Sequence, residues 1–79
     1  MPKIIKSFEQ NGVLFTFLFR EVNLAGGKKY FVTAFGEKND KVDFEMKQNG
    51  RDMWYIAEPA PPWTKQFEIR LSQILMDEG

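Results

Sequence analysis

Four charged side chains share one face of a predicted strand and are the best placed for chemistry. In "KVDFEMK", residues 41–47, side chains alternate between two faces, so Asp43 and Glu45 point the same way. A carboxylate pair at this spacing could serve general acid-base catalysis. Because Lys41 and Lys47 continue the same face, we interpret it instead as a solvated strand face of mixed charge.

The rest of the sequence supplies little for catalysis. The chain has no His and no Cys, so the side chain most often used for acid-base chemistry near neutral pH and the strongest nucleophile are both missing. Ser7 and Ser72 lie within ordinary strand and helix patterns, with no identifiable base beside them. We therefore expect a protein that is not an enzyme, with no catalytic residue, no metal site and no cofactor.

Two glycine-containing segments are candidate ligand loops. "AGGKKY", residues 25–30, combines glycines that expose backbone donors with lysines that attract anions. It lacks the G-x-x-x-x-G-K-[ST] spacing of a phosphate loop and leads into a predicted strand. "GEKND", residues 36–40, lacks the ligand spacing of a calcium loop. Both segments are predicted to be turns, the first of them flexible, with Lys28 and Lys29 as solubilising side chains.

The composition predicts one small domain that needs more than its own core. For a chain of 79 residues, a lone hydrophobic core typically supplies only about 3–5 kcal/mol of net stability. The missing Cys and His exclude disulfides and the usual zinc ligands, which leaves dense apolar packing or a second subunit. Aromatic residues make up 15% of the chain, eight of them Phe, and this favours dense packing.

Charge and hydropathy argue against two classes of partner. Eleven Lys and Arg balance eleven Asp and Glu, so the total charge does not predict a polyanionic partner. "MPKIIKSFEQ", residues 1–10, lacks the apolar stretch of a signal peptide, and the longest apolar run, residues 13–19, is too short to cross a bilayer. We expect a soluble cytoplasmic protein with no membrane partner.

Five predicted strands position these side chains. Asn11-Gly12 and Asn49-Gly50 each separate two apolar-rich segments and favour the positive φ angles of a type I′ hairpin turn. "VNLAGG", residues 22–27, reads as a looser connection. Because every connection is short, consecutive strands should pair antiparallel in a meander. The predicted strands of this single domain, residues 1–79, span approximately 3–10, 13–21, 28–36, 41–48 and 51–58.

Three prolines end the fifth strand. Pro59, Pro61 and Pro62 remove backbone donors and fix φ, so strand and helix are both excluded until the last of them. The helix then spans approximately residues 63–77, with either Pro62 in its first turn or Thr64 as its N-cap.

Three of the strands are apolar on both faces. In residues 13–20, Val13 and the phenylalanines share one face, while Leu14, Thr16 and Leu18 share the other. One helix, roughly 10 Å wide, covers only part of one face of a five-stranded sheet. The second face therefore closes into a partial barrel, packs on a second subunit or binds a ligand.

The helix also has two apolar surfaces. At about 100° per residue, its core stripe consists of Phe67, Leu71, Ile74 and Leu75. Ile69 and Met76 lie roughly opposite that stripe, either as isolated exposed residues or as an intersubunit contact. Trp63 is placed to contact Phe67, four residues on, and so to anchor the helix; a role in recognition is the alternative.

Nucleic-acid binding is the one specific function for which the sequence contains a pattern. Sheet aromatics could stack bases while lysines contact phosphates, and core packing is the alternative for these aromatics. The candidate contacts are Lys28, Lys29, Tyr30, Trp54 and Tyr55. The order of a strand meander and then a helix resembles, in layout, the repeats of the PUR and Whirly single-strand-binding families, which implies association of two such units.

Together these patterns predict an α+β domain, a curved five-stranded antiparallel meander with one C-terminal helix packed on one face. We expect a homodimer, because a second subunit would both supplement the small core and cover the second apolar face. The predicted function is a small non-enzymatic interaction module, self-associating and protein-binding, with a single-stranded nucleic-acid binder as the alternative. The candidate interface residues are Ile69, Met76, Leu14 and Leu18.

Overall fold

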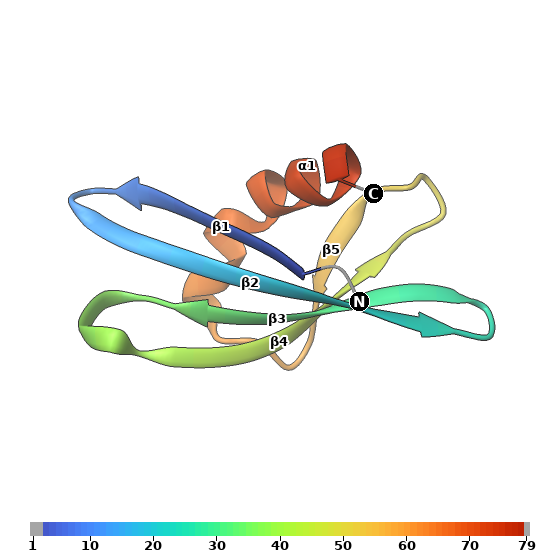
Figure 1. Ribbon diagram of the computed structural model, residues 1–79, viewed down its shortest axis with the longest axis horizontal. Coiled ribbons are helices and arrows are strands. Elements are labelled where there is room, and N and C mark those ends of the chain that lie inside the picture. The colour runs from blue at the N-terminus through green and yellow to red at the C-terminus, as the bar shows by residue number, and fades with distance from the viewer. Residues whose placement is uncertain (1–2, 79) are drawn as a thin grey trace.

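The chain folds into a five-stranded antiparallel sheet followed by a helix, as the sequence predicts. The computed structural model describes residues 3–78, and the strands lie in the sheet in chain order. Figure 1 shows α1 on one side of the twisted sheet, alongside β5. No helix among these residues is long and apolar enough to span a bilayer. The elements are β1 (Lys3–Gln10), β2 (Val13–Leu24), β3 (Gly27–Phe35), η1 (Glu37–Asn39), β4 (Lys41–Gln48), β5 (Trp54–Ala57), η2 (Pro62–Phe67) and α1 (Glu68–Glu78).

The β1–β2 connection is the predicted two-residue turn. Asn11 and Gly12 have φ angles of 55° and 79°, the positive values that a type I′ turn requires. Gln10 and Val13 are paired directly across it. The turn fixes the register of the whole β1–β2 ladder, because each further pair follows from this one.

The β2–β3 connection is tighter than predicted. β2 continues to Leu24, which pairs with Gly27, so only Ala25 and Gly26 make the turn. The prediction of a looser connection over residues 22–27 was wrong, because Val22, Asn23 and Leu24 find strand partners on β3. The resulting β2–β3 ladder is the longest in the sheet.

The prediction of a type I′ turn at Asn49-Gly50 was also wrong. Residues 49–53 connect β4 to β5, and the positive φ falls on Asp52, at 65°. The Asn49 side-chain oxygen accepts hydrogen bonds from the backbone N–H groups of Arg51, at 2.8 Å, and Met53, at 3.2 Å. The Asn49 N–H also donates to the Met53 carbonyl oxygen at 2.8 Å. The side chain and the backbone of Asn49 together close the loop, and β5 is shorter than the predicted strand over residues 51–58.

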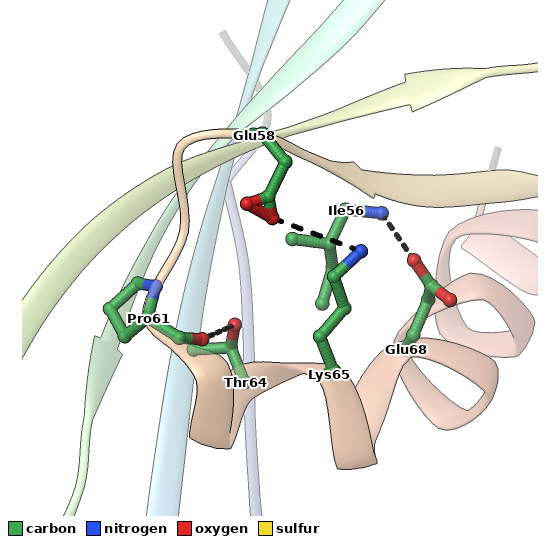
Figure 2. Close-up of polar contacts among 6 residues, drawn as sticks. All are labelled: Ile56, Glu58, Pro61, Thr64, Lys65 and Glu68. Atoms are coloured by element: carbon green, nitrogen blue, oxygen red, sulfur yellow. Dashed lines mark hydrogen bonds and ion pairs between the residues drawn. The ribbon is translucent and has the colours of Figure 1, made fainter.

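The helical segment begins at Pro62, the first of the two predicted starts. Thr64 is not an N-cap: its hydroxyl donates to the carbonyl oxygen of Pro61 at 2.6 Å (Figure 2). Its backbone N–H donates to the same oxygen at 3.0 Å. This geometry closes a tight 3₁₀ turn, and the chain becomes α-helical only from Glu68. The predicted single helix over residues 63–77 therefore consists of two segments.

The hydrophobic core lies between the helical segments and one face of the sheet. The ring of Phe67 is 5.3 Å from Phe17 and 4.8 Å from Phe15, centroid to centroid. Trp63 is 5.6 Å from Phe15 and 6.2 Å from Phe67. The predicted contact between Trp63 and Phe67 is therefore present, and Leu71 and Leu75 extend the buried stripe along α1.

Candidate functional site

The sheet face opposite the helix is open, and we call it the outer face. Its apolar side chains include Ile5, Leu14, Leu18, Val22, Leu24, Phe31 and Phe35. Ile5 and Leu14 are 63% and 62% exposed, and the helix lies on the other side of the sheet (Figure 1). Because the sheet is not closed, the partial barrel predicted as one way of covering this face was wrong.

Most polar side chains of the outer face are paired with one another. The pairs are Ser7 with Thr16 at 2.9 Å, Thr33 with Asp43 at 2.7 Å, and Lys29 with Glu45 at 3.1 Å. The two carboxylates singled out in the sequence thus accept hydrogen bonds from different partners on β3. Asp43 and Glu45 stabilise the sheet surface, in agreement with their interpretation as part of a mixed-charge strand face.

Two cations lie over the ring of Phe31 on the outer face. The guanidinium carbon of Arg20 is 5.7 Å from the centroid of the Phe31 ring, and the Lys29 ammonium is 6.0 Å from it. Cations over a ring face attract its quadrupole and still leave the ring edge available for apolar contacts. The outer face therefore has apolar side chains next to the positive charges of Arg20 and Lys29.

The edge of the sheet at β5 is closed by the helix. The Glu68 carboxylate accepts a hydrogen bond from the Ile56 N–H at 2.8 Å (Figure 2), and the Ser72 hydroxyl accepts one from the Trp54 N–H at 3.0 Å. These two N–H groups point away from β4, where another strand would otherwise pair. Glu68 and Ser72 are four residues apart and so lie on one side of α1. Strand addition at this edge is blocked.

Sequence reasoning missed this closure. The sequence pattern presents Ser72 only as a candidate nucleophile and assigns no role to Glu68. The available signal was a small hydroxyl side chain next to the buried position Leu71, one helical turn after an acidic residue at the start of the helix. The closure gives the buried Ser72 hydroxyl a structural role.

The other edge strand, β1, carries charges that disfavour strand addition. Lys3 is exposed on the outer face, and Lys6 points to the helix side, opposite Phe17 in the register. An inward-pointing lysine is a recognised device against pairing of edge strands, because a strand partner would desolvate it. The outer face, and not an edge, is the part of the sheet best suited to association.

The four predicted interface residues lie on two separate surfaces. Leu14 and Leu18 belong to the outer face, whereas Ile69 lies on the solvent side of α1. Met76 lies on α1 next to the β5 edge, where its sulfur is 3.8 Å from the Ser72 hydroxyl. Ile69 is 71% exposed, but its surroundings on the helix are polar, since Arg70 and Gln73 are exposed beside it. A single flat interface cannot include both pairs, because the sheet and the core separate them.

The candidate nucleic-acid contacts are also divided between the two faces. Tyr30 and Trp54 are each only 4% exposed and belong to the core beneath the helix, so of the three aromatic residues only Tyr55 is at the surface. Lys28 forms an ion pair with Glu21 at 3.2 Å, and Lys29 forms one with Glu45. The two lysines therefore balance local carboxylates and do more than solubilise a turn.

One open cavity does bring basic and aromatic residues together. Its volume is about 340 Å³, and it lies where the β2–β3 turn approaches the end of β4. The lining includes Lys28, Lys29, Lys47 and Tyr55, with Gly26 and Gly27 at the turn. It is the only place among the cavities described for residues 3–78 where three lysines meet an exposed aromatic ring.

Comparison with known proteins identifies no relative: no protein-family model, no curated protein and no solved structure matches the chain.

Proposed function

We propose that the chain is a small non-enzymatic interaction module that self-associates through the outer face. The observation that carries this proposal is the set of exposed and half-buried apolar side chains over β1–β3, which includes Leu14, Leu18 and Phe31 and is interspersed with polar residues. Exposed apolar surfaces of this kind in small soluble domains mark interaction sites. The hydrophobic core on the helix side does not include these residues.

The geometry of the sheet favours face-on association. The β5 edge is occupied by Glu68 and Ser72, and the β1 edge is guarded by an inward-pointing Lys6. Two sheets that pack face to face lie about 10 Å apart and interdigitate their side chains. Such a contact would desolvate both outer faces at once and supplement a core that is small for an independent domain.

The groups that could do chemistry have structural roles, which supports an interaction module over an enzyme. Asp43 and Glu45 are tied to Thr33 and Lys29, and the Ser72 hydroxyl is held by the Trp54 N–H. A nucleophile or base must reach a substrate at hydrogen-bond distance. An interaction module does not require these groups to be free, so their structural roles are compatible with it.

Replacement of Leu18 by Lys tests the proposal. Leu18 lies at the centre of the outer face, so a charge there would be buried in the association and would disfavour it strongly. The mass in solution, measured by light scattering during size exclusion over a dilution series, should change from dimer to monomer. Leu14→Lys, at a position of the same face where the native side chain is 62% exposed, should act in the same direction with less risk to folding. Unchanged dimer affinity in both variants would refute the proposal.

Ile69→Lys is the matched control. It places the same charge on the solvent side of α1, where the exposed fraction of the native side chain is even larger. We expect the dimer affinity of this variant to equal that of the native chain. A loss of association here, with none in the Leu14 and Leu18 variants, would move the interface to the helix patch.

Binding of a single-stranded nucleic acid is the second candidate, favoured by the cavity that unites Tyr55 with three lysines. It ranks second because Lys28 and Lys29 already have carboxylate partners. Titration of a labelled oligonucleotide at several salt concentrations decides it. A nucleic-acid binder would show an affinity that falls with salt and falls again when both lysines are replaced by Gln. The absence of binding at low salt would exclude it.

A further inference from the structure

The outer face is organised in rows of side chains that cross the strands. The registers place one residue from each of β1, β2, β3 and β4 side by side, and the two adjacent rows on the same face follow at steps of two residues. The central row is Ile5, Leu18, Thr33 and Asp43. The flanking rows are Ser7, Thr16, Phe35 and Lys41 on one side, and Lys3, Arg20, Phe31 and Glu45 on the other.

The order of apolar and polar side chains is nearly the same in both directions along the strands from the central row. Along β2 the order is apolar, polar, apolar, polar, apolar, in the residues Leu14, Thr16, Leu18, Arg20 and Val22. Along β3, Phe31 and Phe35 stand on either side of Thr33. Along β4 the two flanking positions carry opposite charges, Lys41 and Glu45. The pattern is therefore symmetric in polarity, and on β4 the two flanking charges have opposite signs. On β1 and β2, the charged Lys3 and Arg20 correspond to the uncharged Ser7 and Thr16.

A two-fold axis makes use of such a pattern. Consider an axis that lies between two packed sheets and runs perpendicular to the strands. Each strand then faces the same strand of the second copy, running in the opposite direction. A residue on one side of the central row therefore meets the equivalent residue on the other side of that row. A symmetric interface must be complementary to itself under this operation. Apolar positions then have to meet apolar positions, and positive charges have to meet negative ones.

We propose that the outer face binds a second copy of the chain around a two-fold axis that crosses the strands at the central row. This inference rests on the proposed function and specifies its geometry. Leu18 and Ile5 each meet their own copy, Phe31 meets Phe35 of the second copy, and Lys41 meets Glu45 of the second copy. In packed sheets whose strand directions differ by about 30°, the contacts near the axis are kept. The long side chains of Lys41 and Glu45, farther from the axis, can still reach each other.

One opposition in this arrangement is unfavourable. Asp43 lies in the central row, so its carboxylate faces the same carboxylate of the second copy, although it also accepts a hydrogen bond from the Thr33 hydroxyl. Asp43→Asn removes the repulsion and retains an oxygen that can accept that hydrogen bond. We expect this variant to dimerise a few-fold more tightly. Weaker or unchanged dimerisation would count against an axis at this row.

A charge exchange tests the pairing of Lys41 with Glu45. Each of Lys41→Glu and Glu45→Lys converts two attractive contacts of the dimer into two repulsive ones, so each variant alone should dimerise roughly tenfold more weakly than the native chain. Mixing the two variants restores both contacts in the heterodimer. The dimer affinity of the mixture, measured by analytical ultracentrifugation at low salt, should return to near the native value. A mixture that stays as weak as its components overturns the proposal.

Two comparisons keep the outcomes distinct. Lys65→Glu makes the same change in net charge on the helical side, next to Glu58, and should leave the dimer affinity unchanged. Circular dichroism on each variant confirms that the chain is folded, which matters for Glu45→Lys because Glu45 also pairs with Lys29. A native chain that is monomeric refutes both the proposed function and this inference. A native dimer that is indifferent to both charge changes refutes only the axis.

Discussion

Replacement of Ser72 by Ala tests the closure of the sheet edge by the helix. The Ser72 side chain is 1% exposed, and its hydroxyl accepts a hydrogen bond from the Trp54 N–H at 3.0 Å. Without the hydroxyl, that buried N–H has no partner, which costs about 1–3 kcal/mol. The higher helix propensity of Ala returns about 0.5 kcal/mol. We therefore expect a net loss of about 0.5–2.5 kcal/mol in the free energy of unfolding.

Urea unfolding followed by circular dichroism measures this loss, which should appear as a lower midpoint at an unchanged m-value. In a domain of this size, each kcal/mol corresponds to about 4–8 °C in Tm. Gln73→Ala, at the next and exposed helix position, is the control and should stay within about 0.5 kcal/mol of the native chain. Faster hydrogen exchange at the Trp54 amide would localise the effect. A Ser72→Ala variant as stable as the native chain would refute the closure.

Two further predictions concern the helix and its anchor. Trp63→Ala should destabilise the domain by about 3 kcal/mol, because the ring fills the space over Phe15 and Phe67; an unchanged urea midpoint would show that Trp63 is not an anchor. Glu68→Ala should cost about 1–3 kcal/mol, since it leaves the Ile56 N–H without its acceptor. Glu68→Gln keeps an acceptor oxygen and should lose less than half as much in the same unfolding experiment, and equal losses in both variants would contradict the role of that hydrogen bond.

Local patterns in the sequence were sufficient to predict most of the sheet. Strict alternation over residues 41–47 identified β4 with its correct bounds, and Asn11-Gly12 identified the first turn and hence its register. These features depend on a few neighbouring residues and on period-two geometry. They are therefore readable without knowledge of the tertiary structure.

The second Asn-Gly pair shows that a local sequence pattern alone does not determine the turn. The same dipeptide makes a two-residue turn at Asn11 and a five-residue loop at Asn49, residues 49–53. In the second case the asparagine side chain bonds to Arg51 and Met53, and the positive φ shifts to Asp52. The strand that follows is fixed by Glu68 and Ser72 from the helix, so its start depends on tertiary contacts absent from the local pattern.

The choice of buried face could not be predicted either. Trp54 and Tyr55 are neighbours on β5 and must point to opposite sides, and the sequence does not say which side the helix covers. The helix covers Trp54 together with Tyr30, which removes both from the surface. The symmetry of the outer face likewise depends on the pairing of Leu18 with Thr33, which the tight turn at Ala25 and Gly26 determines.

The measurement that tests the central claim most directly is the absolute mass of the native chain in solution, determined by light scattering during size exclusion, across dilution and at moderate salt. Association through the outer face predicts a mass of twice 9.3 kDa that returns to a single chain on dilution, and a single chain at all concentrations for Leu18→Lys. A native mass of 9.3 kDa at every concentration would contradict it.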